Sequence, residues 1–143
     1  MTELLDQGIA RVLRRFPEVA AGWLFGSVAR GDARPESDVD VALLFKDKAT
    51  TALSALPTLG RLAAFLEAVA PGRRIDVVLV EAQGPIFQHN VLREGRLVYD
   101  AEPSRRVDFE SDAYVRYFDF LPTYRIADRQ ALDGFRHWLE GKP

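Results

Sequence analysis

The chain has 143 residues, 48% of them hydrophobic, which suits one domain with a buried core. Its formal net charge of −2 lacks the overall basic balance of a dedicated nucleic-acid-binding protein. The sequence has no cysteine, signal-like segment or long apolar run, so we expect no disulfide, no thiolate metal site and no membrane span, which fits a cytoplasmic protein.

The first predicted elements, in chain order, are a helix and two strands. Apolar residues recur at helical spacing over residues 4–16, which predicts an amphipathic helix. The apolar run 20–25 predicts a strand, and residues 38–45 predict a second one after a loop that contains Pro35. Between the two strands, Ser27 is a candidate N-cap for a short helix.

The second half continues the alternation of helices and strands, which indicates an α/β or α+β fold. We predict a helix over 49–70 interrupted near Pro57, a strand over 75–82, a helix over 84–95, a strand over 96–100 and, after the loop 102–106, a helix over 107–126. The residues after 126 read as a mixed tail. We therefore expect a domain over 1–100 and a helical extension over 101–143 that packs on the domain or on a partner.

Two aspartates stand at the beginning of the second predicted strand. Strand side chains alternate between faces, so Asp38 and Asp40 point the same way. Asp76 is the second residue of the next predicted strand. If the two strands pair, all three carboxylates gather at one end of the sheet.

Such a cluster of like charges is unfavourable without a compensating cation. With no cysteine and only two histidines in the chain, the fitting cation is a hard one with oxygen ligands. Magnesium is the natural choice, since it binds through a few carboxylates together with substrate phosphates. Alone, the Asp-x-Asp pattern also fits a polar turn before an edge strand, and Asp76 also fits a cap for a neighbouring loop.

The Gly-Ser pair upstream adds a predicted phosphate site. Gly26 lets the backbone approach a ligand closely, and a helix that starts at Ser27 would direct free N–H groups toward an anion. Arg30 lies about one helical turn further on and adds positive charge. A phosphate site beside a carboxylate cluster is typical of phosphoryl or nucleotidyl transfer.

These residues carry a family resemblance. "GS" followed by "SDVDV" and a later strand aspartate resembles the nucleotidyltransferase superfamily that includes DNA polymerase beta. The longer stretch "GSVARGDARPESDVDVALLF" looks like the minimal nucleotidyltransferase (MNT) branch, whose members are often antitoxins encoded beside a HEPN-domain ribonuclease toxin. The segment "VDFESDAYVRYFDF" is similar to the C-terminal helix of MNT antitoxins. The resemblance implies a polymerase-beta-like nucleotidyltransferase fold, with a small mixed sheet flanked by helices, over residues 1–100.

The resemblance also implies roles for individual residues. Asp38 and Asp40 would hold two Mg²⁺ ions, while Asp76 would share one ion and help to deprotonate the attacking hydroxyl. Gly26 and Ser27 would bind the β- and γ-phosphates of ATP.

Two more residues complete the expected nucleotide site. Arg30 would steady the phosphates or the loop. Ser37 would contact the nucleotide or form a turn with Asp38. By the same resemblance, the acceptor is a tyrosine of a partner HEPN toxin, which receives AMP and is inactivated in a hetero-oligomer.

Two alternatives to this function stay open at the level of sequence. The protein could be an antitoxin that neutralises its toxin by binding alone. It could also modify a small molecule, as aminoglycoside nucleotidyltransferases do, although the roughly forty residues after position 100 are few for the added helical domain of those enzymes. We expect no direct binding to nucleic acid and no association with a membrane.

Overall fold

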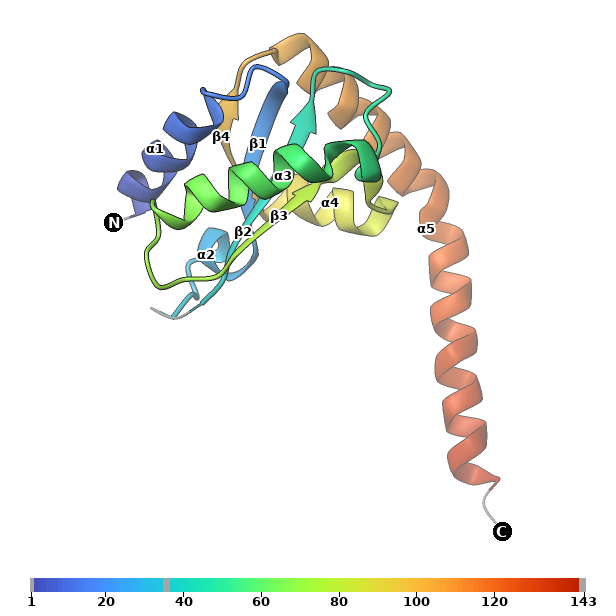
Figure 1. Cartoon of the computed structure of the whole chain (residues 1–143). Helices are drawn as coiled ribbons and strands as arrows, with labels where there is room; N and C mark the ends of the chain where they lie inside the picture. The colour runs from blue at the N-terminus through green and yellow to red at the C-terminus, as the bar shows by residue number, and fades with distance from the viewer. Residues whose placement is uncertain (1, 35–36, 142–143) are drawn as a thin grey trace.

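The computed structural model describes residues 2–34 and 37–141 and shows a sheet covered by helices, with one long helix that leaves the domain (Figure 1). The predicted loop residue Pro35 lies outside the described residues. The elements in chain order are α1 (Thr2–Leu13), β1 (Val19–Phe25), α2 (Gly26–Arg30), β2 (Val39–Phe45), α3 (Ala52–Glu67), β3 (Ile75–Leu79), the 3₁₀ turn η1 (Val80–Ala82), α4 (Pro85–Glu94), β4 (Arg96–Asp100) and α5 (Pro103–Glu140).

The four strands form one mixed sheet in the order β3-β2-β1-β4. β2 and β3 run parallel, whereas β1 is antiparallel to both β2 and β4. The central strands β1 and β2 are almost wholly buried, as expected for apolar runs that are covered on both faces. The predicted fold class, a small mixed sheet flanked by helices, is confirmed.

Each face of the sheet has its own core. Val39, Val41 and Leu43 of β2 point to the face that α1 and α3 cover. Ala42 and Leu44 point to the opposite face, under α4 and the start of α5. The period-2 alternation of β2 thus separates the two cores. By the same parity, Asp40 belongs to the face of α4 and α5.

In the middle of the chain, two observed elements differ from the predicted ones. The strand expected over 75–82 ends at Leu79, where the chain turns into η1. The helix expected over 49–70 is not interrupted: α3 is continuous and contains Pro57. The carbonyl that Pro57 leaves without a helical partner is that of Leu53, a residue 77% exposed, so the missing bond falls on the solvent side of the helix.

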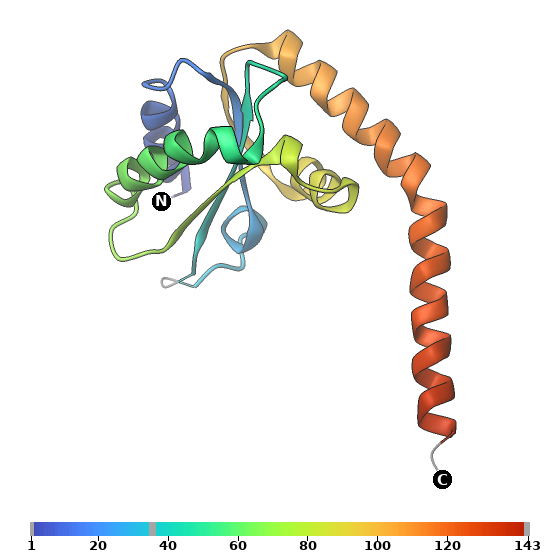
Figure 2. The ribbon, with the colours of Figure 1, turned by 45° about the vertical axis from the view of Figure 1, so that its right-hand side comes forward.

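The largest difference concerns the C-terminal third. Neither the loop 102–106 nor the mixed tail after 126 is observed, because α5 is a single helix of 38 residues. Pro103 opens it, where a missing N–H costs nothing. Its buried residues, Arg105, Phe109 and Ala113, all lie near its start, and the remainder runs away from the domain (Figure 2). A helix half that covers no core leaves only a weak periodic signal in the sequence.

Candidate active site

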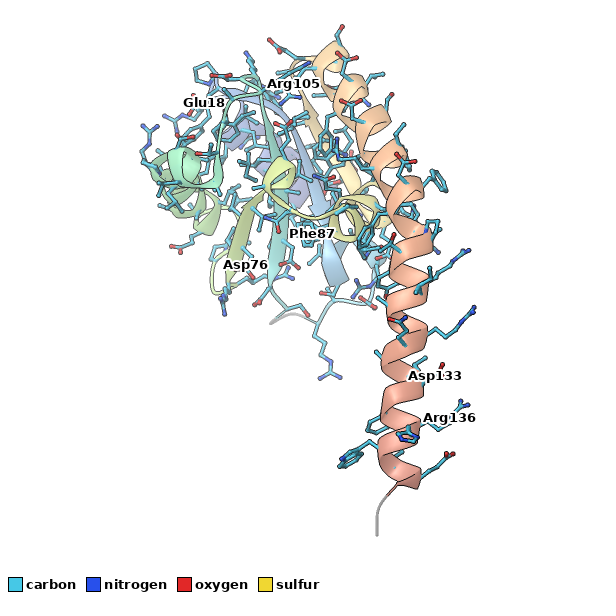
Figure 3. All side chains as sticks on the ribbon, turned by 90° about the vertical axis from the view of Figure 1, so that its right-hand side faces the viewer. Glu18, Asp76, Phe87, Arg105, Asp133 and Arg136 are labelled. Carbon is cyan, nitrogen blue, oxygen red and sulfur yellow. The ribbon has the colours of Figure 1, made fainter. Side chains whose placement is uncertain are left out.

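Two of the three predicted carboxylates stand directly opposite each other in the sheet. Asp40 of β2 pairs in register with Asp76 of β3. Partners on parallel strands point to the same face, so the two side chains are neighbours on the face of α4. Asp38 lies one residue before β2. Figure 3 shows Asp76 near the lower end of β3, far from Glu18 and Arg105 at the opposite end of the domain.

Charge repulsion within this group acts on the carboxyl of Asp40. Burial raises the pKa of the Asp40 carboxyl above its ordinary value, and the charges of Asp76 and Asp38 raise this pKa further. The positive charge of Arg30 acts in the opposite direction. Asp38 and Asp76 are thus close enough to Asp40 to disfavour its ionisation, which is the situation that a bound cation relieves.

Gly26 is required where it stands. Its φ of +76° lies in the left-handed region, and a Cβ at this position would meet Oδ2 of Asp40 at 2.2 Å. The turn after β1 therefore packs its backbone directly against the Asp40 carboxylate. A ligand that reaches this turn also reaches the acidic residues.

The short helix α2 begins two residues earlier than expected from an N-cap at Ser27. Its N-cap is Phe25, without a side-chain cap, so the prediction that Ser27 is the N-cap is wrong. Ser27 lies instead in the first turn of α2, directly after Gly26. At the end of α2, Arg30 lies between two carboxylates: its Nε is 3.4 Å from Oδ2 of Asp32, and its Nη1 is 3.8 Å from Oε2 of Glu94. The contact to Glu94 of α4 was not predictable from the sequence, because it joins two elements far apart in the chain.

Ser37 forms a turn with Arg34 and not with Asp38. Its Oγ accepts a hydrogen bond from the backbone N–H of Arg34 at 2.8 Å. Its carbonyl accepts one from Nε of Arg73, also at 2.8 Å. Arg73 thus holds the residue before Asp38.

The chemistry of these carboxylates suits a divalent cation better than their spacing does. Their oxygen atoms are the ligands that Mg²⁺ prefers, and their mutual repulsion favours a cation. However, no three histidine, cysteine, aspartate or glutamate side chains within residues 2–34 and 37–141 are grouped closely enough to hold a metal ion. Oδ1 of Asp76 lies instead 3.6 Å from Nε of Arg74. The donor chemistry therefore fits Mg²⁺, and the group would have to close around it.

An apolar border lies beside the acidic residues on the same face. Phe25, the partner of Asp40 in β1, packs edge to face against Phe87 of α4, with ring centroids 5.3 Å apart. Val78, two residues after Asp76, packs in the same cluster. Phe25 and Phe87 were not predicted to border the site, because nothing in their local sequence pattern distinguishes them from ordinary core residues.

The geometry agrees with a comparison against protein families. The family described as "Polymerase beta, Nucleotidyltransferase" matches residues 7–104, more than half of the chain. The chain belongs to this nucleotidyltransferase family. The resemblance predicted from the Gly-Ser pair and the Asp-x-Asp pattern is confirmed.

Solved structures extend the comparison. A minimal nucleotidyltransferase is 34% identical, with a TM-score of 0.51, and the match covers 66% of this chain and 93% of that one. A toxin–antitoxin structure with AMP-PNP contains a chain 22% identical, with a TM-score of 0.60, over 90% of this chain and 95% of that one. The structure of a tri-AMPylated Shewanella oneidensis HEPN toxin with its MNT antitoxin contains a chain 21% identical, with a TM-score of 0.57, over 94% and 97%. No curated protein gives a significant match.

The last two similarities show a shared fold and no more, since the sequence identities are only 22% and 21%.

The helix α5, with 38 residues, is long enough to span a membrane. Within the part of the chain that the structure describes, neither α5 nor any other helix is both long and apolar enough to cross a membrane.

Proposed function

We propose that this nucleotidyltransferase transfers AMP from ATP to a hydroxyl group in a magnesium-dependent reaction. The observation that carries the proposal is the direct pairing of Asp40 with Asp76 beside the Gly26 turn. Carboxylates on adjacent strands next to a close backbone turn provide the two parts that nucleotidyl transfer needs, a cation site and a phosphate site.

Asp38, Asp40 and Asp76 would hold the magnesium ions. When bound, Mg²⁺ neutralises charge on the phosphates and lowers the pKa of the acceptor hydroxyl. The contact between Asp76 and Arg74 is no obstacle to binding. The Asp76 carboxylate in it is 44% exposed and the Arg74 side chain 75% exposed, and such exposed pairs contribute little.

The chain's own residues would divide the remaining work. The acceptor oxygen attacks the α-phosphorus, the bond to the β-phosphate oxygen breaks, and pyrophosphate leaves. Asp76 takes the hydroxyl proton as the new P–O bond forms. Gly26 and Ser27 bind the β- and γ-phosphates, and Arg30 exchanges its contacts with Asp32 and Glu94 for the phosphate charge.

We further propose that the acceptor is a tyrosine of a HEPN-domain toxin and that the protein acts as an antitoxin. Two of the structures that share its fold are toxin–antitoxin complexes, one of them with an AMPylated HEPN toxin. Both matches cover at least 90% of this chain and so include part of α5, since the residues before Pro103 make up less than three quarters of it. Neutralisation by binding alone is the competing function.

The test is incubation with ATP, Mg²⁺ and the protein encoded by the neighbouring gene, which we expect to be a HEPN toxin. Mass spectrometry should show gains of whole AMP units on a tyrosine of that protein, and EDTA should abolish them. The doubly substituted variant Asp38→Asn/Asp40→Asn should bind the toxin but transfer nothing. If this variant neutralises the toxin as well as the native protein does, transfer is dispensable and binding alone is the function. If no AMP is gained by any protein or small hydroxyl acceptor, the transferase proposal is wrong.

A further inference from the structure

The second half of α5 is the most unusual surface of the molecule. We call residues 121–140 the distal arm. Ala113 is the last buried residue of α5, yet the arm carries large apolar side chains that are between 49% and 59% exposed. They include Ile126 (57% exposed), Leu132 (59%), Phe135 (59%), Trp138 (59%) and Leu139 (49%). A solvated helix has no need of such residues, so an apolar surface of this size indicates an interaction.

Most of these side chains continue a face that is already in contact with the domain. Tyr117 of α5 stacks on His89 of α4, with ring centroids 3.6 Å apart, and Tyr114 packs edge to face on the same ring. At 100° per residue, the direction of Tyr117 recurs along the arm. We call this the inner face of the arm; it comprises Leu121, Tyr124, Asp128, Ala131, Leu132, Phe135, Trp138 and Leu139. Ile126 lies on the opposite side.

The arm also has a defined position relative to the candidate active site. Figures 1 and 3 show α5 running along one side of the domain, separated from β3, and continuing past the level of the end of the sheet where Asp76 lies. A large protein bound along the inner face would therefore extend from the arm toward that end of the domain. The opposite end, with Arg105 and Glu18, is remote from the arm (Figure 3).

The chemistry of the arm selects a kind of partner. Arg125, Arg129 and Arg136 are balanced by Asp128, Asp133 and Glu140, so the arm has no net charge to attract a polyanion or an anionic membrane. Its inner face is rich in aromatic and aliphatic groups, as in the centres of protein interfaces. A helix that offers such a stripe binds an apolar groove or a second helix of another protein.

We propose that the inner face of the distal arm docks the protein acceptor and so presents its hydroxyl group to the carboxylates. This inference rests on the proposed function, because it assumes that the acceptor is a protein. It divides the molecule into a domain that carries out transfer and an arm that selects the substrate. It predicts that substitutions on the arm change recognition of the acceptor and leave nucleotide binding intact.

Two variants of the full chain test this division. Phe135→Glu places a charge on the inner face, and Ile126→Glu places the same charge on the outer face at a site of equal exposure. We measure the affinity for the protein encoded by the neighbouring gene, AMP transfer to it, and binding of AMP-PNP with Mg²⁺. Phe135→Glu should weaken toxin binding more than about tenfold, as expected for an aromatic interface residue, and lower transfer in proportion. Ile126→Glu should change neither, and both variants should bind AMP-PNP normally.

The outcomes separate this inference from the proposed function. Both proposals hold if Asp38→Asn/Asp40→Asn abolishes transfer and if, of the two arm variants, only Phe135→Glu prevents toxin binding. If no AMP is transferred but Phe135→Glu still prevents binding, the arm docks the partner and only the catalytic proposal fails. Equal effects of the two arm variants would overturn the docking face. So would light scattering that shows the isolated protein to be a dimer which Phe135→Glu dissociates, because the inner face would then belong to a second copy.

Discussion

At the scale of single residues, Gly26 allows the backbone of the turn after β1 to pack against the Asp40 carboxylate. Gly26→Ala would place a methyl group against Asp40 and force a left-handed conformation, which costs about 1–2 kcal/mol by itself. We expect lower stability in urea and, in calorimetry, loss of most AMP-PNP binding in the presence of Mg²⁺. Gly31 is the matched control, since its φ is +81° but no atom lies within 4 Å of its added Cβ. Gly31→Ala should lose similar stability but keep the affinity for AMP-PNP. If both variants lost affinity equally, the close contact between Gly26 and Asp40 would not matter for nucleotide binding.

Asp40 offers a prediction with a defined pH dependence. Because the pKa of Asp40 is raised in the folded state, the stability that its carboxyl contributes is present below its ordinary pKa of 3.8 and is lost as pH rises through the folded pKa. At pH 7 in EDTA, Asp40→Asn should therefore have a higher Tm than the native protein. This difference should shrink as the pH approaches 4.

Magnesium should reverse the order at pH 7. A cation that binds the folded carboxylates stabilises the native protein by mass action and has less effect on Asp40→Asn. Calorimetric scans with and without Mg²⁺ measure both effects, with Asp119→Asn on exposed α5 as the control for removing one negative charge. A lower Tm for Asp40→Asn in EDTA would mean that repulsion among the aspartates does not act on the fold.

At the scale of elements, one buried arginine fixes the root of α5. Arg105 is 8% exposed, donates to the carbonyl of Phe45 at 3.1 Å, and pairs with Glu81 of η1. Arg105→Met should cost about 3 kcal/mol, near the lower end for breaking a buried pair, because Glu81 keeps 24% exposure. Adding Glu81→Gln should recover part of the loss in urea denaturation. Strict additivity of the two substitutions would show that the pair is not coupled.

The elements also show how far the sequence can be interpreted. The period-2 alternation of the strand predicted over 38–45 put Asp38 and Asp40 on one face from local geometry alone, whereas the observed β2 starts at Val39 and leaves Asp38 one residue outside the strand. Asp40 meets Asp76 only because β2 and β3 pair. The sequence alone could not establish this pairing, which the structure shows to be parallel. The hydrogen bond from Arg73 to Ser37 joins residues 36 positions apart, so no local pattern contains it.

The errors in element prediction have a common physical origin. Pro57 suggested a break, but the capping box of Thr51 and Ser54 starts α3 firmly, and burial of Leu62 and Leu66 continues it. The end of β3 at Leu79 follows from tertiary contacts of η1, where Val80 is buried. The length of α5 was missed because the last buried residue of this helix is Ala113, so burial in the domain core does not mark the helix beyond that point.

At the scale of the whole molecule, the direction of the arm matters as much as its surface. Figure 2 shows the axis of α5 changing direction part-way along, and Pro122 lies inside the helix. A proline removes one helical hydrogen bond and its ring clashes with the preceding turn, which bends a helix. The bend turns the arm from its initial outward course to one that runs down beside the domain, clear of the sheet (Figure 2).

Pro122→Ala should therefore separate the direction of the arm from its chemistry. The straightened helix would continue outward, so small-angle X-ray scattering should give a larger radius of gyration, and circular dichroism should give unchanged or higher helix content. Toxin binding should persist because Leu121, Tyr124 and Phe135 keep their side chains, whereas AMP transfer should fall because the acceptor no longer stands at Asp40 and Asp76. Unchanged transfer from a straightened arm would mean that the acceptor reaches the carboxylates without guidance from α5.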